Sequence, residues 1–527
     1  MKRVFKTVLC FLLLPFASAC KNNNSYHHSV SIDNPIDISE FSFELLDDDT
    51  YSISAKNKDI AGDLVIPETY NGKKVTQIAN DAFCGCENIA SLHMSKSVKT
   101  IGENAFNNAH IASAETIFIH DNVNTIGKNC FSSIKCEGKI VIGKGVKEIP
   151  QFAFSNSDFE EIVLGENIET IGDRSFFHTN VSELFIPKKV SSIYNGLFAG
   201  QSSKLKNITV DKENAIFKDI DGVLFDKNGD LILYPNRDSK LYEIPDGTTR
   251  ISEYAFCDYN KVLNKVIIPS SVIDIESFAF YDCDGLNEIV LNEGLTTLNE
   301  VIVVDCSSFE KINIPNSVSS VSPLFVRPAP KEIIVANDHP HFVTEDGVLY
   351  SKDFKTLVKA FNFKITDTNY QLKEGVERLL SNSFSGLNYN NVQEMETFMA
   401  CDSLKYVEPY VFRQTLIKTI IFNDNAVFTG DGCLADLNRL VQITLPKNLP
   451  SIPNRCFYGC SELKEISIPH SVSSIGRQPI AYTKIENIYY AGTKEEWNTI
   501  INDIDITENL SSTSLTIHCT DGDLSLL

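Results

Sequence analysis

A six-residue phrase recurs along this 527-residue chain at a nearly constant interval. It is clearest at Ile101-Gly-Glu-Asn-Ala-Phe106 and returns, for example, as Ile171-Gly-Asp-Arg-Ser-Phe176. Aligned on its last residue, the phrase marks Phe83, Phe106, Phe131, Phe154, Phe176, Phe198, Phe256, Phe280, Val303, Val326, Phe384, Phe398, Phe412, Leu434, Phe457 and Ile480. Most steps are 22 to 25 residues. A fixed step of that size predicts a solenoid, in which each unit buries its apolar face against its neighbours.

A short strand is expected before each phrase, because apolar residues there alternate with a period of two. Leu184-Phe185-Ile186-Pro187 and Ile466-Ser467-Ile468-Pro469 are examples. Proline ends such a ladder because it has no N–H to donate. One strand per repeat predicts a parallel β-sheet along one face, and the Ala-Phe pair is expected to fill the interior of each coil.

The segment Leu463 to Gly476 runs Leu-Lys-Glu-Ile-Ser-Ile-Pro-His-Ser-Val-Ser-Ser-Ile-Gly. It follows, nearly residue for residue, the pattern L-x-x-I-x-I-P-x-S-V-x-x-I-G-x-x-A-F. The chain therefore resembles the BspA-like leucine-rich repeat surface lipoprotein family, over about residues 40 to 520. This resemblance implies a β-rich leucine-rich repeat solenoid with about 22–23 residues per repeat. It also implies adhesion to host extracellular proteins such as fibronectin or fibrinogen, or to other bacteria.

Two steps in the repeat are long, since Phe198 to Phe256 and Val326 to Phe384 each span 58 residues. They share the motifs Asp221-Gly-Val-Leu-Phe225 and Asp346-Gly-Val-Leu-Tyr350. Asn228-Gly229 favours a tight hairpin turn. We expect two β-hairpin insertions, near residues 211–245 and 336–370, that project from the coil. Around residues 385–412, where two units are only 14 residues long, we expect an irregular coil.

The remaining segments form the ends of the chain. Residues 40–63 contain a strand, a turn and a strand and are expected to cap the start of the solenoid at 64–484. Residues 485–527 are expected to cap its other end. There, Thr493 and Glu496 have the spacing of a helix capping box, and Trp497 is the only tryptophan. A bulky cap suits an open solenoid end, which otherwise exposes core.

Residues 1–19 have the pattern of a signal peptide, with Lys2, Arg3 and Lys6 ahead of an apolar run. Ala17-Ser-Ala-Cys20 is similar to a bacterial lipobox, which predicts lipidation of Cys20; ordinary cleavage after Ala17-Ser-Ala19 is the alternative. Residues 20–39 then form a polar tether. The expected location is a membrane-anchored lipoprotein at the cell surface, with a periplasm-facing or secreted protein as alternatives.

Composition excludes some partners. A formal net charge of −22 disfavours nucleic acid and anionic lipid surfaces, so contact with a membrane is expected only through the lipid anchor. Most cysteines fall at two fixed places beside the Phe position, which predicts buried thiols; some disulfide bridges are the alternative for an exported chain.

Catalytic and metal-binding patterns do not occur in a suitable context. The sequence has no G-x-S-x-G, no H-E-x-x-H and no phosphate-binding glycine loop. His339 and His341 flank a proline, and we interpret them as part of a solvated loop. The run Asp226 to Asp230 resembles the start of a calcium loop but lacks its later ligands, so a hairpin turn is favoured. We therefore expect no enzyme activity, no cofactor and no metal.

One outward-facing position per strand forms a column that is largely apolar in its first half. Its members are Phe118, Val141, Val163, Phe185, Thr209, Ile267, Val290, Asn313, Ile334, Ile421, Thr444 and Ser467. Strand propensity alone explains β-branched residues there. An exposed apolar stripe also marks a protein-binding face. The candidate face consists of Phe118, Val141, Val163, Phe185, Ile267, Val290 and Ile334.

The sequence thus predicts a non-enzymatic surface adhesion lipoprotein that binds a large protein partner through its solenoid. A structural or glycan-binding envelope lipoprotein is the alternative. The sequence defines neither the ligand nor the oligomeric state.

Overall fold

Each coil of the computed structural model runs through a long strand, a turn, a short strand and a second turn that carries the Ala-Phe pair. In one coil these strands are β14 (Glu183–Ile186) and β15 (Ser192–Ile193). Equivalent strands of successive coils pair in parallel, as β14 does with β16 (Asn207–Val210). The structure describes residues 32–194, 196–197, 204–256, 261–327, 329–361, 368–385, 395–501 and 504–526. The predicted parallel β-solenoid of leucine-rich repeats is confirmed.

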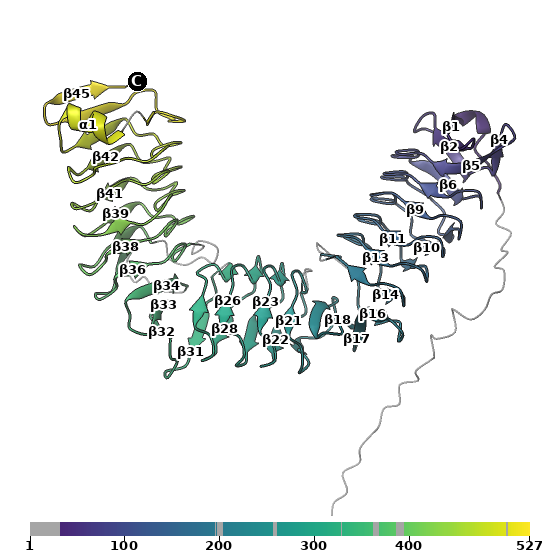
Figure 1. The fold of residues 1–527 in the computed structure, drawn as a ribbon, viewed down its shortest axis with the longest axis horizontal. Helices are drawn as coiled ribbons and strands as arrows, with labels where there is room; N and C mark the ends of the chain where they lie inside the picture. The colour runs from purple at the N-terminus through teal and green to yellow at the C-terminus, as the bar shows by residue number, and fades with distance from the viewer. Residues whose placement is uncertain are drawn as a thin grey trace, which may run out of the picture.

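The solenoid is divided into three limbs, which Figure 1 shows as the two arms and the base of a U. The N-terminal limb holds a 3-10 helix (Ile38–Glu40), β1 (Phe41–Leu45), β2 (Tyr51–Ala55), β3 (Ala61–Val65), β4 (Thr69–Tyr70), β5 (Lys73–Ile78), β6 (Asn88–His93), β7 (Thr100–Ile101), β8 (Ile117–Ile119), β9 (Thr125–Ile126), β10 (Lys139–Ile142), β11 (Glu148–Ile149), β12 (Glu161–Val163), β13 (Thr170–Ile171), β14, β15 and β16.

The middle limb forms the base of the U. It holds β20 (Leu241–Glu243), β21 (Arg250–Ile251), β22 (Lys265–Ile268), β23 (Asp274–Ile275), β24 (Phe280–Tyr281), β25 (Glu288–Leu291), β26 (Thr297–Leu298), β27 (Val303–Val304), β28 (Lys311–Ile314), β29 (Ser320–Val321), β30 (Val326–Arg327) and β31 (Glu332–Val335). Its long strands form one sheet in the order β20-β22-β25-β28-β31.

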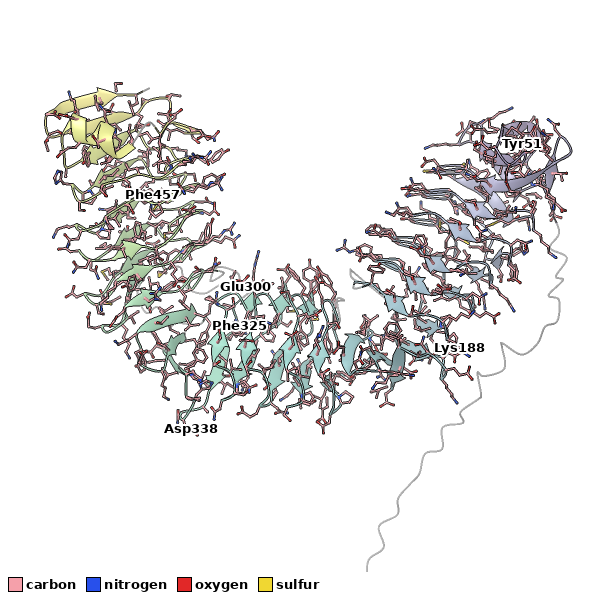
Figure 2. The ribbon with its side chains drawn as sticks, viewed as in Figure 1. Tyr51, Lys188, Glu300, Phe325, Asp338 and Phe457 are labelled. Atoms are coloured by element: carbon pink, nitrogen blue, oxygen red, sulfur yellow. The ribbon has the colours of Figure 1, made fainter. Side chains whose placement is uncertain are left out.

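The C-terminal limb forms the other arm. It holds β35 (Asn369–Gln371), β36 (Arg378–Leu379), β37 (Thr397–Met399), β38 (Tyr406–Val407), β39 (Thr419–Ile421), β40 (Val427–Phe428), β41 (Gln442–Thr444), β42 (Glu465–Ile468), β43 (Asn487–Tyr490), α1 (Lys494–Ile501), β44 (Thr516–Cys519) and β45 (Gly522–Ser525). Figure 2 shows Lys188 and Asp338, from turns that follow long strands, at the outer rim of the U, and Glu300 at the inner rim.

Stacked phenylalanine rings form the centre of the core. In the N-terminal limb the rings of Phe106 and Phe131 lie 5.3 Å apart and nearly parallel, and those of Phe131 and Phe154 lie 5.7 Å apart. The rings are fully buried. Phe256 and Phe280 continue the arrangement in the middle limb at 4.7 Å. The predicted core role of the Ala-Phe pair is confirmed for the described residues, and Phe198 lies outside them.

The turn that carries Phe is built from alternating backbone conformations. Asn104 and Asn108, two residues before and after Phe106, have positive φ angles of 54° and 56°. The N–H groups of Asn104, Phe106 and Asn108 all donate to carbonyls of the next coil, at 2.8 to 3.0 Å. The intervening N–H groups bond within the turn. Because alternate N–H groups bond to the next coil and the others bond within the turn, the backbone polar groups of the turn are satisfied without a helix. The coil is therefore thin.

Two antiparallel units, which we call elbows, stand where the sequence has its long steps. The first elbow is β17 (Phe217–Ile220), β18 (Val223–Asp226) and β19 (Asp230–Leu233), and the second is β32 (Phe342–Glu345), β33 (Val348–Ser351) and β34 (Thr356–Ala360). The last strand of each pairs in parallel with the next limb, β19 with β21 and β34 with β36. The elbows are therefore joined to the wall of the solenoid.

Each elbow separates two hydrophobic cores. In β18, Leu224 packs into the core of the N-terminal limb, whereas Val223 and Phe225 pack into that of the middle limb. In β33, Leu349 packs into the middle core and Tyr350 into the C-terminal core. The middle strands are buried on both faces. The expectation that these segments project from the coil is wrong, because both of their faces are needed to cover the ends of two cores.

A buried polar side chain braces the entry to the first elbow. The amide of Asn214 donates to the carbonyls of Pro187 and Val190, both at 2.9 Å. Its oxygen accepts from the backbone N–H groups of Ile216 and Phe217. The side chain thus ties the preceding coil to the start of β17.

His339 does the same at the second elbow. Its Nδ1 accepts from the backbone N–H groups of His341 and Phe342, both at 3.1 Å, so Nε2 carries the proton and donates to the carbonyl of Pro315 at 3.0 Å. His339 is fully buried, and burial lowers its pKa. The interpretation of a solvated loop is therefore wrong for His339, which takes at the second elbow the role that Asn214 has at the first. His341 is exposed.

One repeat position differs from the sequence assignment. Phe398 lies in the long strand β37, where it pairs in register with Ile420, and does not occupy the Ala-Phe turn. The turn positions are Phe384 and Phe412, whose rings lie 5.1 Å apart. The two short units of 14 residues are therefore one longer coil, part of which lies outside the described residues.

Both ends carry additional structure. β1 and β2 pair antiparallel ahead of the first coil. At the other end, the N–H of Thr493 donates to Glu496 at 2.8 Å and the N–H of Glu496 donates to the Thr493 hydroxyl at 3.3 Å, which is the predicted capping box of α1. Trp497 on this helix is buried over the last coil.

Apart from Cys283, the described cysteines are free thiols, most of them in the core. Cys283 and Cys306 lie three residues after their Phe-equivalent, and Cys433 occupies the Ala position, as expected; all three are buried. Burial raises the pKa of Cys433 to about 11 and that of Cys460 to about 12, which makes these thiols poor nucleophiles. Cys84 and Cys519 are half-buried, and Cys257 lies outside the described residues.

Candidate partner-binding face

The candidate face is the outward side of the long-strand sheets. In β10, Ile140 and Ile142 are buried, so Val141 between them points outward. Val141 stands in register with Phe118 on β8 and with Val163 on β12. Phe118 keeps 46 % of its surface exposed, while the two valines are half-buried by their neighbours. Three consecutive coils thus present one continuous apolar strip.

Further apolar members of the column lie on the following sheets, with the polar Thr209 and Glu243 between Phe185 and Ile267. Phe185 on β14 is 47 % exposed and stands in register with Thr209. In the middle limb, Ile267 and Val290 stand opposite each other on β22 and β25. Ile334 on β31 is 38 % exposed. All seven predicted face residues thus point outward, four of them half-buried and three exposed, and the long-strand sheets bring them together in runs within the first two limbs.

Asn313 interrupts the apolar column. Its side-chain amide donates to the carbonyl of Leu291, and its oxygen accepts from the N–H of Leu291, both at 2.7 Å. These two bonds replace part of the ladder between β25 and β28, whose backbone pairing covers only two residue pairs. The polar residue therefore has a structural role.

A row of ion pairs borders the column. Lys139 and Glu161 lie 2.7 Å apart, Lys265 and Glu288 lie 2.8 Å apart, and Lys311 and Glu332 lie 3.4 Å apart. Each pair joins adjacent strands, two positions before a column residue. Exposed pairs of this kind add about 0–1 kcal/mol each to stability. Their arrangement, an apolar centre beside a charged border, resembles the anatomy of protein interfaces.

The column also extends into the C-terminal limb. Met399, Ile421 and Thr444 stand in register on β37, β39 and β41, and Ser467, Tyr489 and His518 on β42, β43 and β44. Met399 is absent from the predicted column because the sequence pattern places Phe398 in the turn. Tyr489 is absent because its strand falls in the predicted cap; its signal in the sequence is the alternation of Ile488 and Tyr490 around it.

A serine, a histidine and an aspartate meet at the start of the solenoid. Ser91 donates to Asp63 at 2.6 Å, and Nε2 of His93 lies 2.8 Å from the same hydroxyl. The hydrogen bond from Ser91 lowers the pKa of Asp63. Because Ser91 gives its only proton to Asp63, His93 is the donor in the other bond and cannot act as a base toward the serine. The cluster therefore does not have the connectivity of a nucleophilic triad.

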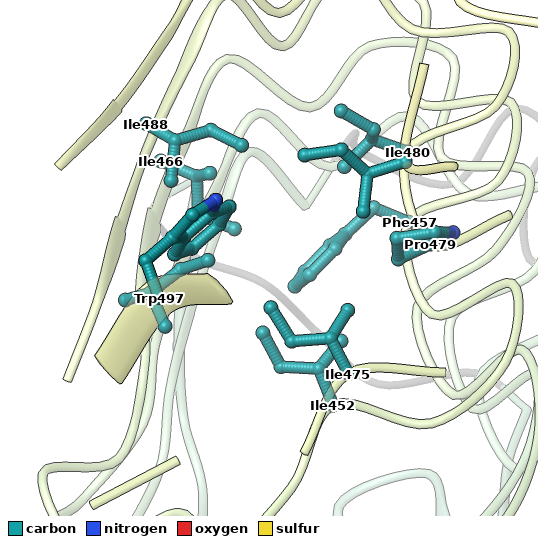
Figure 3. A pocket seen from close by; sticks show the side chains of 10 residues that line it. Ile452, Phe457, Ile466, Ile475, Pro479, Ile480, Ile488 and Trp497 are labelled. Atoms are coloured by element: carbon teal, nitrogen blue, oxygen red, sulfur yellow. The ribbon is translucent and has the colours of Figure 1, made fainter. Parts of the chain in front are cut away.

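The cavity beneath Trp497, which caps the core of the C-terminal limb, is too small for a ligand. The cavity between Trp497 on one side and Phe457 and Pro479 on the other measures about 10 Å³ and is lined by apolar side chains (Figure 3). That volume is about one water molecule. The Trp497 indole N–H finds no hydrogen-bond partner within the described residues.

Within the part of the chain that the structure describes, no three His, Cys, Asp or Glu side chains gather as a metal-binding group. No helix there has the length and apolar character needed to cross a bilayer. Cys20, proposed for lipidation, and the signal peptide lie outside the described residues.

Comparison with known proteins agrees with the repeat pattern. The family described as BspA type leucine rich repeat region (6 copies) matches residues 63–137, 136–231, 234–326 and 388–504, most of the chain. No curated protein matches this chain. The solenoids of this family are generally non-catalytic, and the family as a whole indicates a surface or protein-interaction role.

Solved structures with similar folds come from several bacteria. A leucine rich cell surface protein from Faecalibacterium prausnitzii is 20% identical, with 89% of this chain and 97% of that chain covered and a TM-score of 0.41. The pneumococcal vaccine antigen PcpA is 16% identical, with 90% and 96% covered and a TM-score of 0.42. A leucine-rich repeat protein from Bacteroides ovatus is 17% identical, with 90% and 98% covered and a TM-score of 0.36. The chain described above belongs to the BspA-type leucine-rich repeat family.

Proposed function

We propose that this protein is a non-enzymatic adhesion lipoprotein of the cell surface, which binds a large protein partner through the outward column of its first two limbs. The observation that supports this most strongly is the continuous strip of Phe118, Val141 and Val163, which stand in register on three consecutive coils. Soluble proteins rarely keep a contiguous apolar strip in water unless it is covered by a partner. Burying such a strip is worth roughly 25 cal/mol per Å² before the costs of association.

The geometry supports a large partner over a small one. A column spread over successive coils of a solenoid offers an extended surface, which suits another protein. Family resemblance points to host extracellular proteins such as fibronectin or fibrinogen, or to proteins of other bacteria. The negative net charge favours partners with a basic surface.

A glycan-binding role is less well supported. Sugars stack on exposed ring faces, and in the aromatic pair at the turns of the middle limb each ring covers one face of the other. The rings of Tyr254 and Phe278 lie 5.6 Å apart at an angle of 15°, so the two facing sides cover each other.

The test of the binding face is a double variant with a matched control. Val163→Lys with Phe185→Glu places charges on the column while keeping the net charge unchanged. Thr170→Lys with Tyr194→Glu makes an equivalent change elsewhere in the same limb, on or next to the short strands β13 and β15. Binding to immobilised fibronectin, fibrinogen and intact bacterial cells should fall only in the first variant, with both thermal midpoints retained. Equal binding by the two variants contradicts the proposed face.

The lipid anchor has its own test. Cys20→Ser removes the thiol that would carry the lipid and should move the protein from the membrane fraction to the soluble fraction of cells. A Cys10→Ser variant is the matched control, because Cys10 lies within the proposed signal peptide. Retention of the Cys20 variant in the membrane pellet contradicts lipid anchoring.

A further inference from the structure

A shallow groove crosses the outward face of β41, β42 and β43 in the C-terminal limb. Its volume is about 830 Å³, within the range of roughly 300–1,000 Å³ that is common for small-ligand sites. It is lined by residues 441–445, residues 465–469 and Tyr489, Tyr490 and Ala491. Cα atoms of β41 and β42 approach within 8 Å, so the two strands close the floor. A ligand would therefore lie on top of the outward side chains.

Tyr489 forms one wall of the groove as a fixed aromatic platform. Its ring is 43 % exposed and stacks on the ring of His518, with centroids 4.8 Å apart and planes 17° apart. His518 is itself held by hydrogen bonds to Asp523 and Asn487, each at 3.0 Å. One face of Tyr489 thus rests on a neighbour that cannot easily rotate. The other face is turned the opposite way, toward β42.

Small polar side chains form the floor beside that second face. Ser467 stands in register with Tyr489 on β42, and Thr444 is the outward residue of β41. Both are exposed. Because neither side chain is tall enough to cover a tyrosine ring, a flat ligand can rest on the floor with one side against Tyr489. The two hydroxyl groups can each donate and accept a hydrogen bond.

A carboxylate and an amide border the floor. Glu465 and Gln442 lie two positions before Ser467 and Thr444, so they point to the same face of their strands. None of these four side chains makes a hydrogen bond or ion pair within the described residues. Glu465 is the only charged side chain among the residues that line the groove. Its two oxygens can accept bonds from two neighbouring hydroxyl groups of a ligand.

This set of groups matches a sugar better than a peptide. The C–H groups on one side of a pyranose ring carry partial positive charge and suit the negative face of an aromatic ring. The sugar hydroxyls suit the carboxylate, the amide and the two floor hydroxyls. An extended peptide would need a free strand edge or an apolar pocket for an anchor side chain. The closed floor offers no space for an added strand, and the exposed side chains around it are mainly polar.

We propose that this groove is a carbohydrate-binding site for a short oligosaccharide, with one sugar ring stacked on Tyr489 and its hydroxyls bonded to Glu465 and the floor. The carboxylate repels acidic sugars, so the ligand is a neutral or amino sugar. The site lies in a different limb from the proposed protein-binding face and does not depend on it.

The experiment is a glycan array probed with the full-length protein, followed by calorimetry with the glycan that binds best. Neutral or amino sugars should be retained, and sialylated glycans should not. Tyr489→Ala should weaken binding by about tenfold, the loss of one stacking contact, whereas Tyr489→Phe should keep the affinity. Ser467→Ile should abolish binding, because a branched side chain then fills the floor. Glu465→Gln should weaken binding less than Tyr489→Ala does.

Two control variants keep the groove intact. Tyr482→Ala removes a 48 % exposed tyrosine of the same limb that does not line the groove, and Thr209→Ile makes a similar change on a strand of the N-terminal limb. Both should bind the glycan normally. Circular dichroism should show that all variants are folded, since the exchanged side chains are exposed. The Val163→Lys, Phe185→Glu protein should also bind the glycan normally, which separates this site from the proposed function.

Four outcomes overturn the inference: an array without a bound glycan, full affinity in Tyr489→Ala, an equal loss in Tyr482→Ala, or preferred binding of sialylated glycans. Mild periodate, which cleaves neighbouring sugar hydroxyls, tests the alternative occupant. It should remove the part of the binding to intact bacterial cells that depends on Tyr489. Binding that depends on Tyr489 and survives periodate means that the groove holds a peptide, and the carbohydrate assignment is then wrong.

Discussion

A single backbone conformation recurs once per coil, two residues before the Phe position. The residue there has a positive φ in nearly every described coil, whether it is Asn104 at 54°, Phe152 at 57° or Val301 at 53°. Asparagine tolerates this region, whereas a β-branched residue is strained by its Cβ. The fold therefore imposes the conformation, and the amino acid at this position changes only its energetic cost.

Exchanging the residues at this position should change stability in opposite directions. Val301→Asn should raise the free energy of unfolding by about 1 kcal/mol, and Asn104→Val should lower it by a similar amount, because the left-handed region costs an ordinary residue about 1–2 kcal/mol. Thermal melts of both variants measure this. If Val301→Asn lowers the midpoint, packing of the valine side chain outweighs the strain, and the explanation fails.

The elbows are the elements that the repeat pattern alone does not explain. Asn214 and His339 brace them in the same way: one side-chain atom accepts from two N–H groups, and a nitrogen donates to the preceding coil, through two bonds for Asn214 and one for His339. His339→Asn should keep this arrangement and the melting midpoint. His339→Ala leaves two buried N–H groups without a partner and should cost about 1–3 kcal/mol per unsatisfied group. An alanine variant as stable as the asparagine variant contradicts the brace.

The second elbow also contains a buried lysine without a carboxylate. Nζ of Lys359 donates to the carbonyl of Ser385 at 2.8 Å, and burial lowers its pKa to about 7. Between about pH 7 and 10.5, the unfolded chain keeps the proton on Lys359, whereas the folded protein has released it. Folding stability should therefore rise with pH across this window, by up to about 1.4 kcal/mol per pH unit, and should stay low and flat below pH 7.

The comparison variant comes from the first elbow. Leu233 pairs with Leu224 as Lys359 pairs with Leu349, so leucine fills the equivalent position. In urea titrations from pH 6 to 10, Lys359→Leu should flatten the dependence of folding stability on pH. The substitution should stabilise the protein most at pH 6. Leu233→Lys should introduce a destabilising charge. An unchanged pH profile in Lys359→Leu means that another group causes it.

At the scale of the whole molecule, the sequence predicts the coil well and the shape of the solenoid poorly. The period, the Phe core and the outward column all follow from residues at fixed spacing. The elbows do not, because Val223 and Leu224 look alike in sequence although they enter different cores. Phe398 was misassigned because a buried strand residue and a turn residue are both phenylalanine. The role of His339 depends on contacts between coils, which single-sequence periodicity does not specify.

Three separate cores predict unfolding in more than one step. Trp497 is the only tryptophan and lies in the C-terminal core, so its fluorescence follows that limb, whereas far-ultraviolet circular dichroism follows all three. The two urea transitions should not coincide. Ile101→Ala, in the N-terminal core, should move the dichroism curve and leave the fluorescence midpoint in place. Ile466→Ala should move the fluorescence midpoint. Superimposable transitions in every variant contradict division by the elbows.

The most direct measurement of the central claim, that the outward column meets a protein partner, is site-specific photo-crosslinking. Benzoylphenylalanine replaces Phe185, on the column, or Tyr194, which follows β15 in the same coil and is 56 % exposed. Each protein is mixed with fibronectin, fibrinogen or intact bacterial cells and irradiated. A partner that covers the column gives a covalent adduct from position 185 and none from position 194. Adducts from position 194 alone, equal adducts from both, or none from position 185 would contradict a partner-binding column.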